Sequence, residues 1–263
     1  MNFEHRETWL HRVNPSVKLL AFLLYFIAIL FIHNINVLIN LTWANLFLLF
    51  AYSGHPYRRL LLYASPFLLI FISSSTAMMF FGEGETTWVR WGLLHITEES
   101  FYRGLHIGFR ALNFAALGLL FALTTGPVRL FYSLMQQLKL PPRFSYSFMA
   151  AIRLIPIMFE EFQTLRQAAR VRGGLSGRGP GAVYRKLRFY AIPLLAQSIR
   201  RAQRIAVAME AKRFVSNRER TYYYIIGYSW RDALYIAVLI GSFACAWWIG
   251  TGWPYFDITD VRG

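Results

Sequence analysis

The feature that most constrains this chain is the segregation of its apolar residues into long, almost uncharged runs. Such runs have about the length needed to cross roughly 30 Å of hydrocarbon. The sequence therefore predicts an all-α integral membrane protein with about five transmembrane helices, embedded in a lipid bilayer. The predicted transmembrane helices cover residues 17–32, 35–52, 60–81, 104–124 and 233–250.

A strongly basic block separates the fourth apolar run from the fifth. Residues 125–221 contain 18 Lys and Arg against four acidic residues, so this block carries +14 of the chain's net charge of +15. In its second half, apolar residues recur mostly at three- and four-residue steps with arginines between them, which is typical of an amphipathic helix. We expect helices over residues 127–138, 144–172 and 182–214.

These patterns divide the chain into three parts. Residues 1–124 hold the first four transmembrane helices, residues 125–221 form a coupling domain of long helices, and residues 222–263 hold the last transmembrane helix and a tail. Pro156 and Pro193 lie inside the two longest predicted helices, where we expect proline to kink them.

The Lys and Arg residues of the loops predict the orientation, because cytoplasmic loops carry an excess of these residues. The N-terminal segment, the loop with Arg58 and Arg59, and the basic block all fall on one side when the runs alternate across the bilayer. The acidic loop before the fourth run and the C-terminal tail fall on the other side. We therefore expect the N-terminus and the coupling domain to be cytoplasmic.

The two longest predicted helices end in similar sequences, forty positions apart. One closes with AARVRG at residues 168–173 and the other with AMEAKRF at residues 208–214. Each places a cation at the helix tip after small residues, which suggests a clamp for two similar partners. The alternative is that these cations only complement the helix dipole and lipid phosphates. The residues alone leave both interpretations open.

Two polar residues lie inside the fourth predicted transmembrane helix. Arg110 and, one turn earlier, His106 are on one face of it. A charge within a membrane is costly and often functional, so these side chains are candidates for an intramembrane functional site. Arg110 could also extend to the membrane surface or pair with a carbonyl group. The six histidines have no carboxylate or cysteine partners at ligand spacing, so neither a metal site nor a cofactor is expected.

Some function classes are disfavoured by what the sequence lacks. It has no Gly-rich phosphate loop followed by Lys and Ser or Thr, so we do not expect this chain to bind or hydrolyse ATP. Nucleic-acid binding by the basic block is disfavoured because membrane phosphates are nearer. The alternative that stays open is an integral membrane enzyme that modifies lipids on a basic cytoplasmic face. None of the predicted transmembrane helices contains an Asp or Glu for such chemistry.

Several segments, taken in order, resemble the transmembrane (T) components of energy-coupling factor transporters. Residues 10–20 (LHRVNPSVKLL) resemble the opening of that family. The resemblance continues through four further segments and covers nearly the whole chain: residues 103–110 (RGLHIGFR), 123–127 (LTTGP), 152–156 (IRLIP) and 171–173 (VRG).

This resemblance implies a non-catalytic scaffold subunit of an ATP-driven importer for a vitamin or a metal ion, in a bacterial or archaeal cell membrane. Its partners would be two ATP-binding-cassette ATPase subunits, or one with two ATPase domains, and a substrate-binding membrane subunit. The family's Ala-Arg-Gly signature, which reaches a groove in each ATPase, maps first onto Val171, Arg172 and Gly173, with valine in place of alanine. Its second copy maps onto Ala211, Lys212 and Arg213.

The second copy departs from the signature, because lysine replaces arginine and Arg213 replaces glycine. Lysine keeps the charge and loses the planar fork, and arginine lacks the backbone freedom of glycine. Either Arg213 makes the second contact in a shifted register, or the two ATPase sites differ, and we favour the second interpretation. Members that serve thiamin or its pyrimidine precursor show such divergence, which suggests one of these compounds as the substrate. Other vitamins, cobalt and nickel stay open as alternatives.

Overall fold

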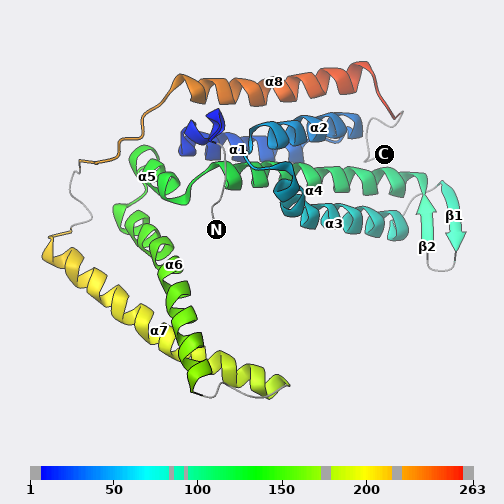
Figure 1. Ribbon diagram of the computed structural model, residues 1–263. Coiled ribbons are helices and arrows are strands. Elements are labelled where there is room, and N and C mark those ends of the chain that lie inside the picture. Colours follow the sequence, from blue (N-terminus) through cyan, green and yellow to red (C-terminus); the bar gives the residue numbers. More distant parts are fainter. Residues whose placement is uncertain (1–6, 83–85, 92–93, 173–178, 215–220, 257–263) are drawn as a thin grey trace. The chain divides into compact units, whose positions relative to one another are not determined.

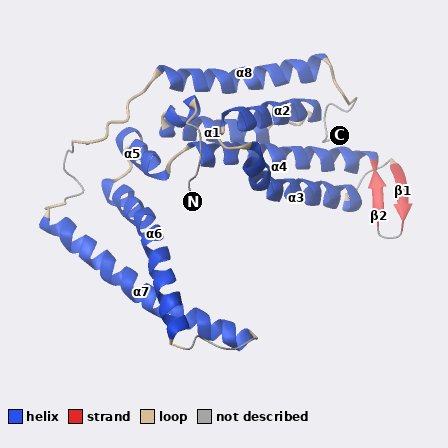
Figure 2. Cartoon of the chain, in the orientation of Figure 1, coloured by secondary structure: helices blue, strands red, loops and turns tan. Residues whose placement is uncertain are grey.

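The computed structural model describes residues 7–82, 86–91, 94–172, 179–214 and 221–256. Within it the chain forms two compact units. The first, the membrane unit, comprises Met1–Leu130 and Ile226–Gly263. The second, the coupling unit, comprises Phe131–Ile225. Helices make up most of the described residues of both units (Figure 2).

The membrane unit consists of helices that match the predicted apolar runs. Among the described residues, four helices can cross a membrane by length and composition, and a shorter apolar helix of 16 residues, α1, accompanies them. The predicted class, an all-α integral membrane protein, is confirmed. The elements of this unit are a 3₁₀ turn η1 (Trp9–Arg12), α1 (Pro15–Leu30), α2 (Ile35–Tyr52), α3 (Tyr57–Phe81), β1 (Thr87–Trp91), β2 (Leu94–Thr97), α4 (Glu98–Thr124) and α8 (Trp230–Gly252).

The largest differences from the predicted elements lie between α3 and α4. There, β1 and β2 form a short antiparallel hairpin, drawn in red in Figure 2, that the sequence did not predict. Helix α4 begins at Glu98 rather than at residue 104. The hydroxyl of Thr97 accepts a hydrogen bond from the Ser100 backbone, and Glu98 and Glu99 occupy the first turn. This cap and these charges stabilise a helix start that hydropathy does not reveal.

The core of the membrane unit contains a buried polar joint between α2 and α4. The Asn113 amide donates to the Thr42 hydroxyl at 2.7 Å and to the Leu38 carbonyl at 3.2 Å. The Asn45 amide in turn donates to the side-chain oxygen Oδ1 of Asn113 at 2.7 Å. All three polar side chains are buried. Because lipid gives apolar helices little reason to associate, such interhelical hydrogen bonds help to hold the bundle together.

Helices α3 and α4 approach closely at glycines. A Cβ atom at Gly104 would lie 2.7 Å from the Ser75 carbonyl oxygen, and one at Gly108 would lie 2.9 Å from the Phe71 ring. Small residues therefore set the distance between these two backbones, as is usual for helices packed in a membrane.

The coupling unit is built around two long helices, α6 (Pro142–Val171) and α7 (Pro180–Ala211), which follow α5 (Pro127–Gln137). Helices α6 and α7 cross each other (Figure 1). Arg201 and Glu161 form an ion pair between them, and the rings of Phe162 and Tyr190 lie 5.3 Å apart. Each helix is continuous through its internal proline, and the expected kinks at these prolines stay a prediction.

Candidate functional site: the tips of the two long helices

The first candidate tip is the C-terminal end of α6. The helix ends at Val171, and Arg172 is its C-cap, with backbone angles φ −82° and ψ 19°. The backbone N–H of Arg172 donates to the Ala168 carbonyl at 3.2 Å. Arg170, Val171 and Arg172 are all exposed, so this end presents its cations to solvent or to a partner. Gly173, the third residue of the predicted signature, lies outside the described residues.

The second candidate tip, at the end of α7, has the same geometry. Lys212 is the C-cap, with φ −85° and ψ 11°, and its backbone N–H donates to the Ala208 carbonyl at 3.2 Å. Lys212 therefore occupies on α7 the position that Arg172 occupies on α6. The sequence left open whether the second tip is shifted by one residue, and the cap geometry aligns the two tips without a shift.

The residue after the second cap has an unusual backbone. Arg213 has φ 54°, in the left-handed region that favours glycine. Its N–H donates to the Glu210 carbonyl at 2.8 Å, and the Phe214 N–H donates to the Met209 carbonyl at 2.9 Å. This is the pattern of a Schellman helix end, whose left-handed position is usually glycine. The departure of the second signature from glycine thus falls on the position where the backbone needs glycine most.

A shallow cavity of about 480 Å³ lies along α7 next to its tip. Its lining combines two arginines with small and apolar side chains, which suits a protein surface that offers both acceptors and apolar groups. The lining residues are Arg200, Gln203, Arg204, Val207, Ala208 and Ala211.

The two intramembrane candidates, Arg110 and His106, meet at the end of α1. The Arg110 guanidinium donates to the Ile32 carbonyl at 2.9 Å and to the Leu30 carbonyl at 3.4 Å, and His106 Nε2 lies 3.1 Å from the Ile32 oxygen. Helix α1, at 16 residues, rises only about 24 Å. The carbonyls of Leu30, its last residue, and of Ile32, in the turn that follows, lie beside α4, where these side chains contact them.

A buried cluster that the sequence analysis did not single out lies at the other end of the membrane unit. The Lys18 ammonium is buried and donates to the carbonyls of Leu10, at 2.7 Å, and Thr124, at 3.2 Å. The Asp232 carboxylate accepts from the backbone N–H of Asn14 at 2.7 Å. Asn14 and Lys18 belong to the LHRVNPSVKLL segment. Through these contacts the segment joins η1, α1, α4 and α8.

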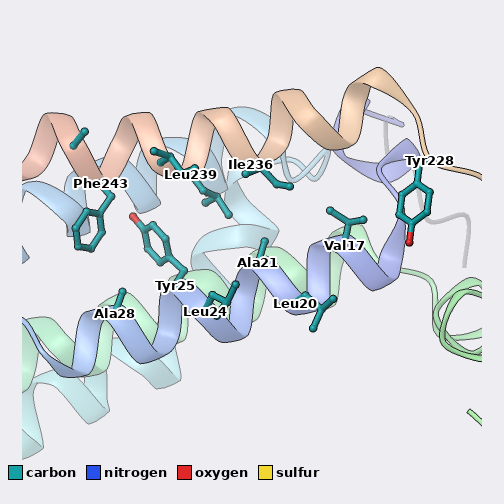
Figure 3. A pocket seen from close by; sticks show the side chains of 12 residues that line it. Val17, Leu20, Ala21, Leu24, Tyr25, Ala28, Tyr228, Ile236, Leu239 and Phe243 are labelled. Atoms are coloured by element: carbon teal, nitrogen blue, oxygen red, sulfur yellow. The ribbon is translucent and has the colours of Figure 1, made fainter. Parts of the chain in front are cut away.

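An apolar groove of about 580 Å³ runs between α1 and α8 (Figure 3). Its lining side chains, among them Leu24, Leu239 and Phe243, are hydrocarbon except for the hydroxyls of Tyr25 and Tyr228. The Tyr25 hydroxyl lies 3.2 Å from the Ser242 hydroxyl. Such a lining suits lipid chains or another apolar helix, and it offers no charged group to a polar solute. Among the residues that the structure describes, no three His, Cys, Asp or Glu side chains gather as a metal site would require.

Apolar helices able to cross a membrane, together with a coupling unit whose two long helices end in matched cationic tips, define a multi-pass helical membrane protein. The family described as cobalt transport protein (CbiQ) matches residues 6–223. The chain belongs to this family and is a transmembrane T component of an energy-coupling factor transporter.

Curated relatives are similar along nearly their whole length. The chain is 27% identical over 237 residues to "Energy-coupling factor transporter transmembrane protein EcfT" of Lacticaseibacillus paracasei, covering 86% of this chain and 88% of the relative. It is 27% identical over 257 residues to the protein of that name from Brevibacillus brevis, covering 92% and 94%. It is 29% identical over 245 residues to the protein of that name from Streptococcus thermophilus, covering 89% of this chain and 91% of the relative. The chain is thus the non-catalytic transmembrane component, and ATP hydrolysis belongs to a separate chain.

Proposed function

We propose that this chain is the scaffold that couples two ATPase domains to a substrate-binding membrane subunit in an importer for a vitamin or a metal ion. The observation that carries the proposal is the matched pair of tips. Arg172 and Lys212 cap their helices with nearly the same backbone angles, and both tips are exposed. Two equivalent cationic ends on one chain are suited to two related partner domains.

The proposal assigns each tip to one ATPase domain, with Arg172 and Gly173 at the first and Lys212 and Arg213 at the second. Because Lys212 aligns with Arg172, the two tips differ in the chemistry of the cation. Arg172 offers a planar guanidinium with several donors, and Lys212 offers a compact ammonium. This supports two unequal ATPase sites, which a single polypeptide with two different ATPase domains would provide.

The substrate-binding subunit is proposed to contact apolar surface that the coupling unit leaves exposed. Ile155 and Phe159 on α6 are 66% and 61% exposed, and Leu187 and Leu195 on α7 are 66% and 61% exposed. Arginines lie between these apolar side chains. Bilayer hydrocarbon would leave the charges unsolvated, and water would leave the apolar side chains exposed. A second protein chain would satisfy both kinds of side chain.

The proposed orientation has the N-terminus and residues 125–221 in the cytoplasm of a bacterial or archaeal cell, in the cell membrane. It is supported by the Lys and Arg bias of the loops. In this arrangement ATP would close the paired ATPases and move the two tips together. Bending at Pro156 and Pro193 would then reshape the faces that hold the substrate-binding subunit and release or reorient it.

The test is co-purification of the ATPases from membranes with the wild-type chain and with charge-reversed tips, Arg172→Glu and Lys212→Glu/Arg213→Glu. We expect each tip variant to lose most of its bound ATPase, because a repelled charge at a docking contact costs several kcal/mol. Arg166→Glu on α6 and Arg188→Glu on α7 reverse exposed charges outside the two signature segments and serve as matched controls.

Two results would contradict the proposal. One is a wild-type chain that retains no ATPase. The other is an equal loss of ATPase in the tip variants and in the Arg166→Glu and Arg188→Glu controls. If only one tip variant loses ATPase, the two sites are unequal, as we favour.

A further inference from the structure

A polar cavity of about 240 Å³ lies in the membrane unit where α1 ends beside α4. Four side chains that carry or can acquire positive charge line it: His33, Arg103, His106 and Arg110. Leu30 and Ile107 form part of its apolar border, and no Asp or Glu is among the described residues that line it. The cavity is therefore built for an anion, and nothing in the proposed coupling function uses it.

The position of this cavity follows from the unequal lengths of neighbouring helices. Lys18 bonds Thr124, and Arg110 bonds Ile32, so α1 and α4 run antiparallel. Helix α4, with 27 residues, rises about 40 Å, against about 24 Å for α1. The turn that follows α1 therefore ends partway along α4 and leaves a recess beside it. Arg103 and His106 lie on the part of α4 that extends beyond Arg110.

Exposed apolar side chains border the recess. Leu30 is 43% exposed and Ile107 is 38% exposed. A ligand that combines one anionic group with hydrocarbon would place its charge among the cations and its chains against these side chains. Phospholipids have this composition, and their headgroups lie at the ends of transmembrane helices.

We propose that this cavity binds the phosphate group of a phospholipid. Guanidinium groups match phosphate oxygens with two parallel hydrogen bonds, and a histidine adds a further donor. The carbonyls of Leu30 and Ile32 hold one edge of Arg110, which fixes the guanidinium at the cavity. Arg103 also lies one turn after Glu99 on α4, so phosphate must compete with this carboxylate for part of its charge. A small phosphate ester shares the same chemistry, and the apolar border favours the lipid.

The experiment is native mass spectrometry of the full chain in detergent with added phosphatidylglycerol, with diacylglycerol, which lacks phosphate, and with glycerol phosphate, which lacks acyl chains. We expect bound phosphatidylglycerol on the wild type and little of the other two. Arg103→Gln/Arg110→Gln should weaken phosphatidylglycerol binding about tenfold or more, because two charge-assisted contacts are lost. Arg58→Gln/Arg59→Gln removes the same charge from exposed positions in the membrane unit and should leave binding nearly unchanged.

A second pair of variants guards against misfolding, because Arg110→Gln also removes bonds to carbonyl groups. Arg103→Gln alone and His33→Gln leave those bonds in place, and each should weaken binding by a smaller factor. The thermal midpoint without lipid serves as the folding check for all variants. If the chain retains glycerol phosphate and not phosphatidylglycerol, the bound phosphate group belongs to a soluble phosphate ester, and the phospholipid proposal is wrong. Equal retention of phosphatidylglycerol and diacylglycerol, or equal loss in the Arg58→Gln/Arg59→Gln control, would overturn the proposal.

Discussion

The membrane unit and the coupling unit differ in how much of their helices is buried within this chain. Half of the residues of α2 are buried within the chain, and its Thr42 and Asn45 bond α4. By contrast, α6, with 30 residues, buries only Ser145 and Ala169, and α7, with 32 residues, buries only Ala182. The first unit joins α2 to α4 through buried hydrogen bonds, and the second leaves mixed apolar and cationic faces exposed.

This difference teaches where substitutions should act. In the membrane unit, polar residues that look functional in the sequence are used to join helices, so replacing them should lower stability. In the coupling unit, few side chains are buried, so most replacements should change partner binding and leave the fold intact.

Replacing the buried lysine of the membrane unit should have the largest effect on stability. Lys18→Met removes the ammonium that bonds the Leu10 and Thr124 carbonyls and leaves those buried acceptors without it. We expect the free energy of unfolding in detergent to fall by about 3 kcal/mol, the scale for breaking a buried charged contact. Tryptophan fluorescence during thermal unfolding measures the change. Lys186→Met on the exposed face of α7 is the control, and an equal loss there would contradict the division.

A pair of glycines on α4 provides a sharper test of packing. A Cβ at Gly104 would meet the Ser75 carbonyl and Met79, whereas nothing lies within 4 Å of a Cβ at Gly118. We expect Gly104→Ala to destabilise the membrane unit by about 2 kcal/mol through overpacking. Gly118→Ala should be neutral or stabilise by up to about 1 kcal/mol, because alanine is the better helix former. Similar effects of both variants on the thermal midpoint would show that the α3–α4 distance is not set at Gly104.

The ion pair between α6 and α7 should have a smaller effect. Glu161 and Arg201 are about a fifth to a quarter exposed, so their attraction is partly screened. Glu161→Gln should cost about 1 kcal/mol of local stability, seen as a few-fold faster limited proteolysis of the coupling unit. The adjacent, exposed Glu160 gives the control Glu160→Gln. Combining Glu161→Gln with Arg201→Gln should cost less than the two single changes added together, and strict additivity would argue against a direct pair.

Much of the fold could be predicted because hydropathy and helical periodicity are local properties of sequence. The predicted transmembrane residues 35–52 coincide with α2, and the two long helices of the coupling unit begin and end within a few residues of the prediction. The start of α4 was missed because a hydroxyl cap at Thr97, not an apolar run, sets that helix start. The hairpin of β1 and β2 was also not predicted.

The polar joints could not be predicted, because they connect residues far apart in the sequence. Asn14 and Asp232 are separated by 218 positions, and Asp232 lay just outside the predicted transmembrane residues 233–250. Arg110 was recognised as unusual, but its carbonyl partners on Leu30 and Ile32 depend on where the short α1 ends. The tips were the most predictable part of the candidate site, since each is a local helix end with its own sequence. The assignment of those tips to ATPase partners stays a prediction.

The smallest expected effect is the most informative about the second tip. Arg213 holds a left-handed backbone that costs a non-glycine residue about 1 kcal/mol, so Arg213→Gly should stabilise the end of α7 by up to that amount. Slower hydrogen exchange at the last turn of α7 measures this gain, and Lys139→Gly, at the other left-handed non-glycine position described, is the comparison. If the chain tolerates this backbone cost because Arg213 contacts an ATPase, the glycine variant becomes more stable and binds ATPase less well. A variant that is both more stable and fully able to bind would leave Lys212 as the cation that matters at this tip.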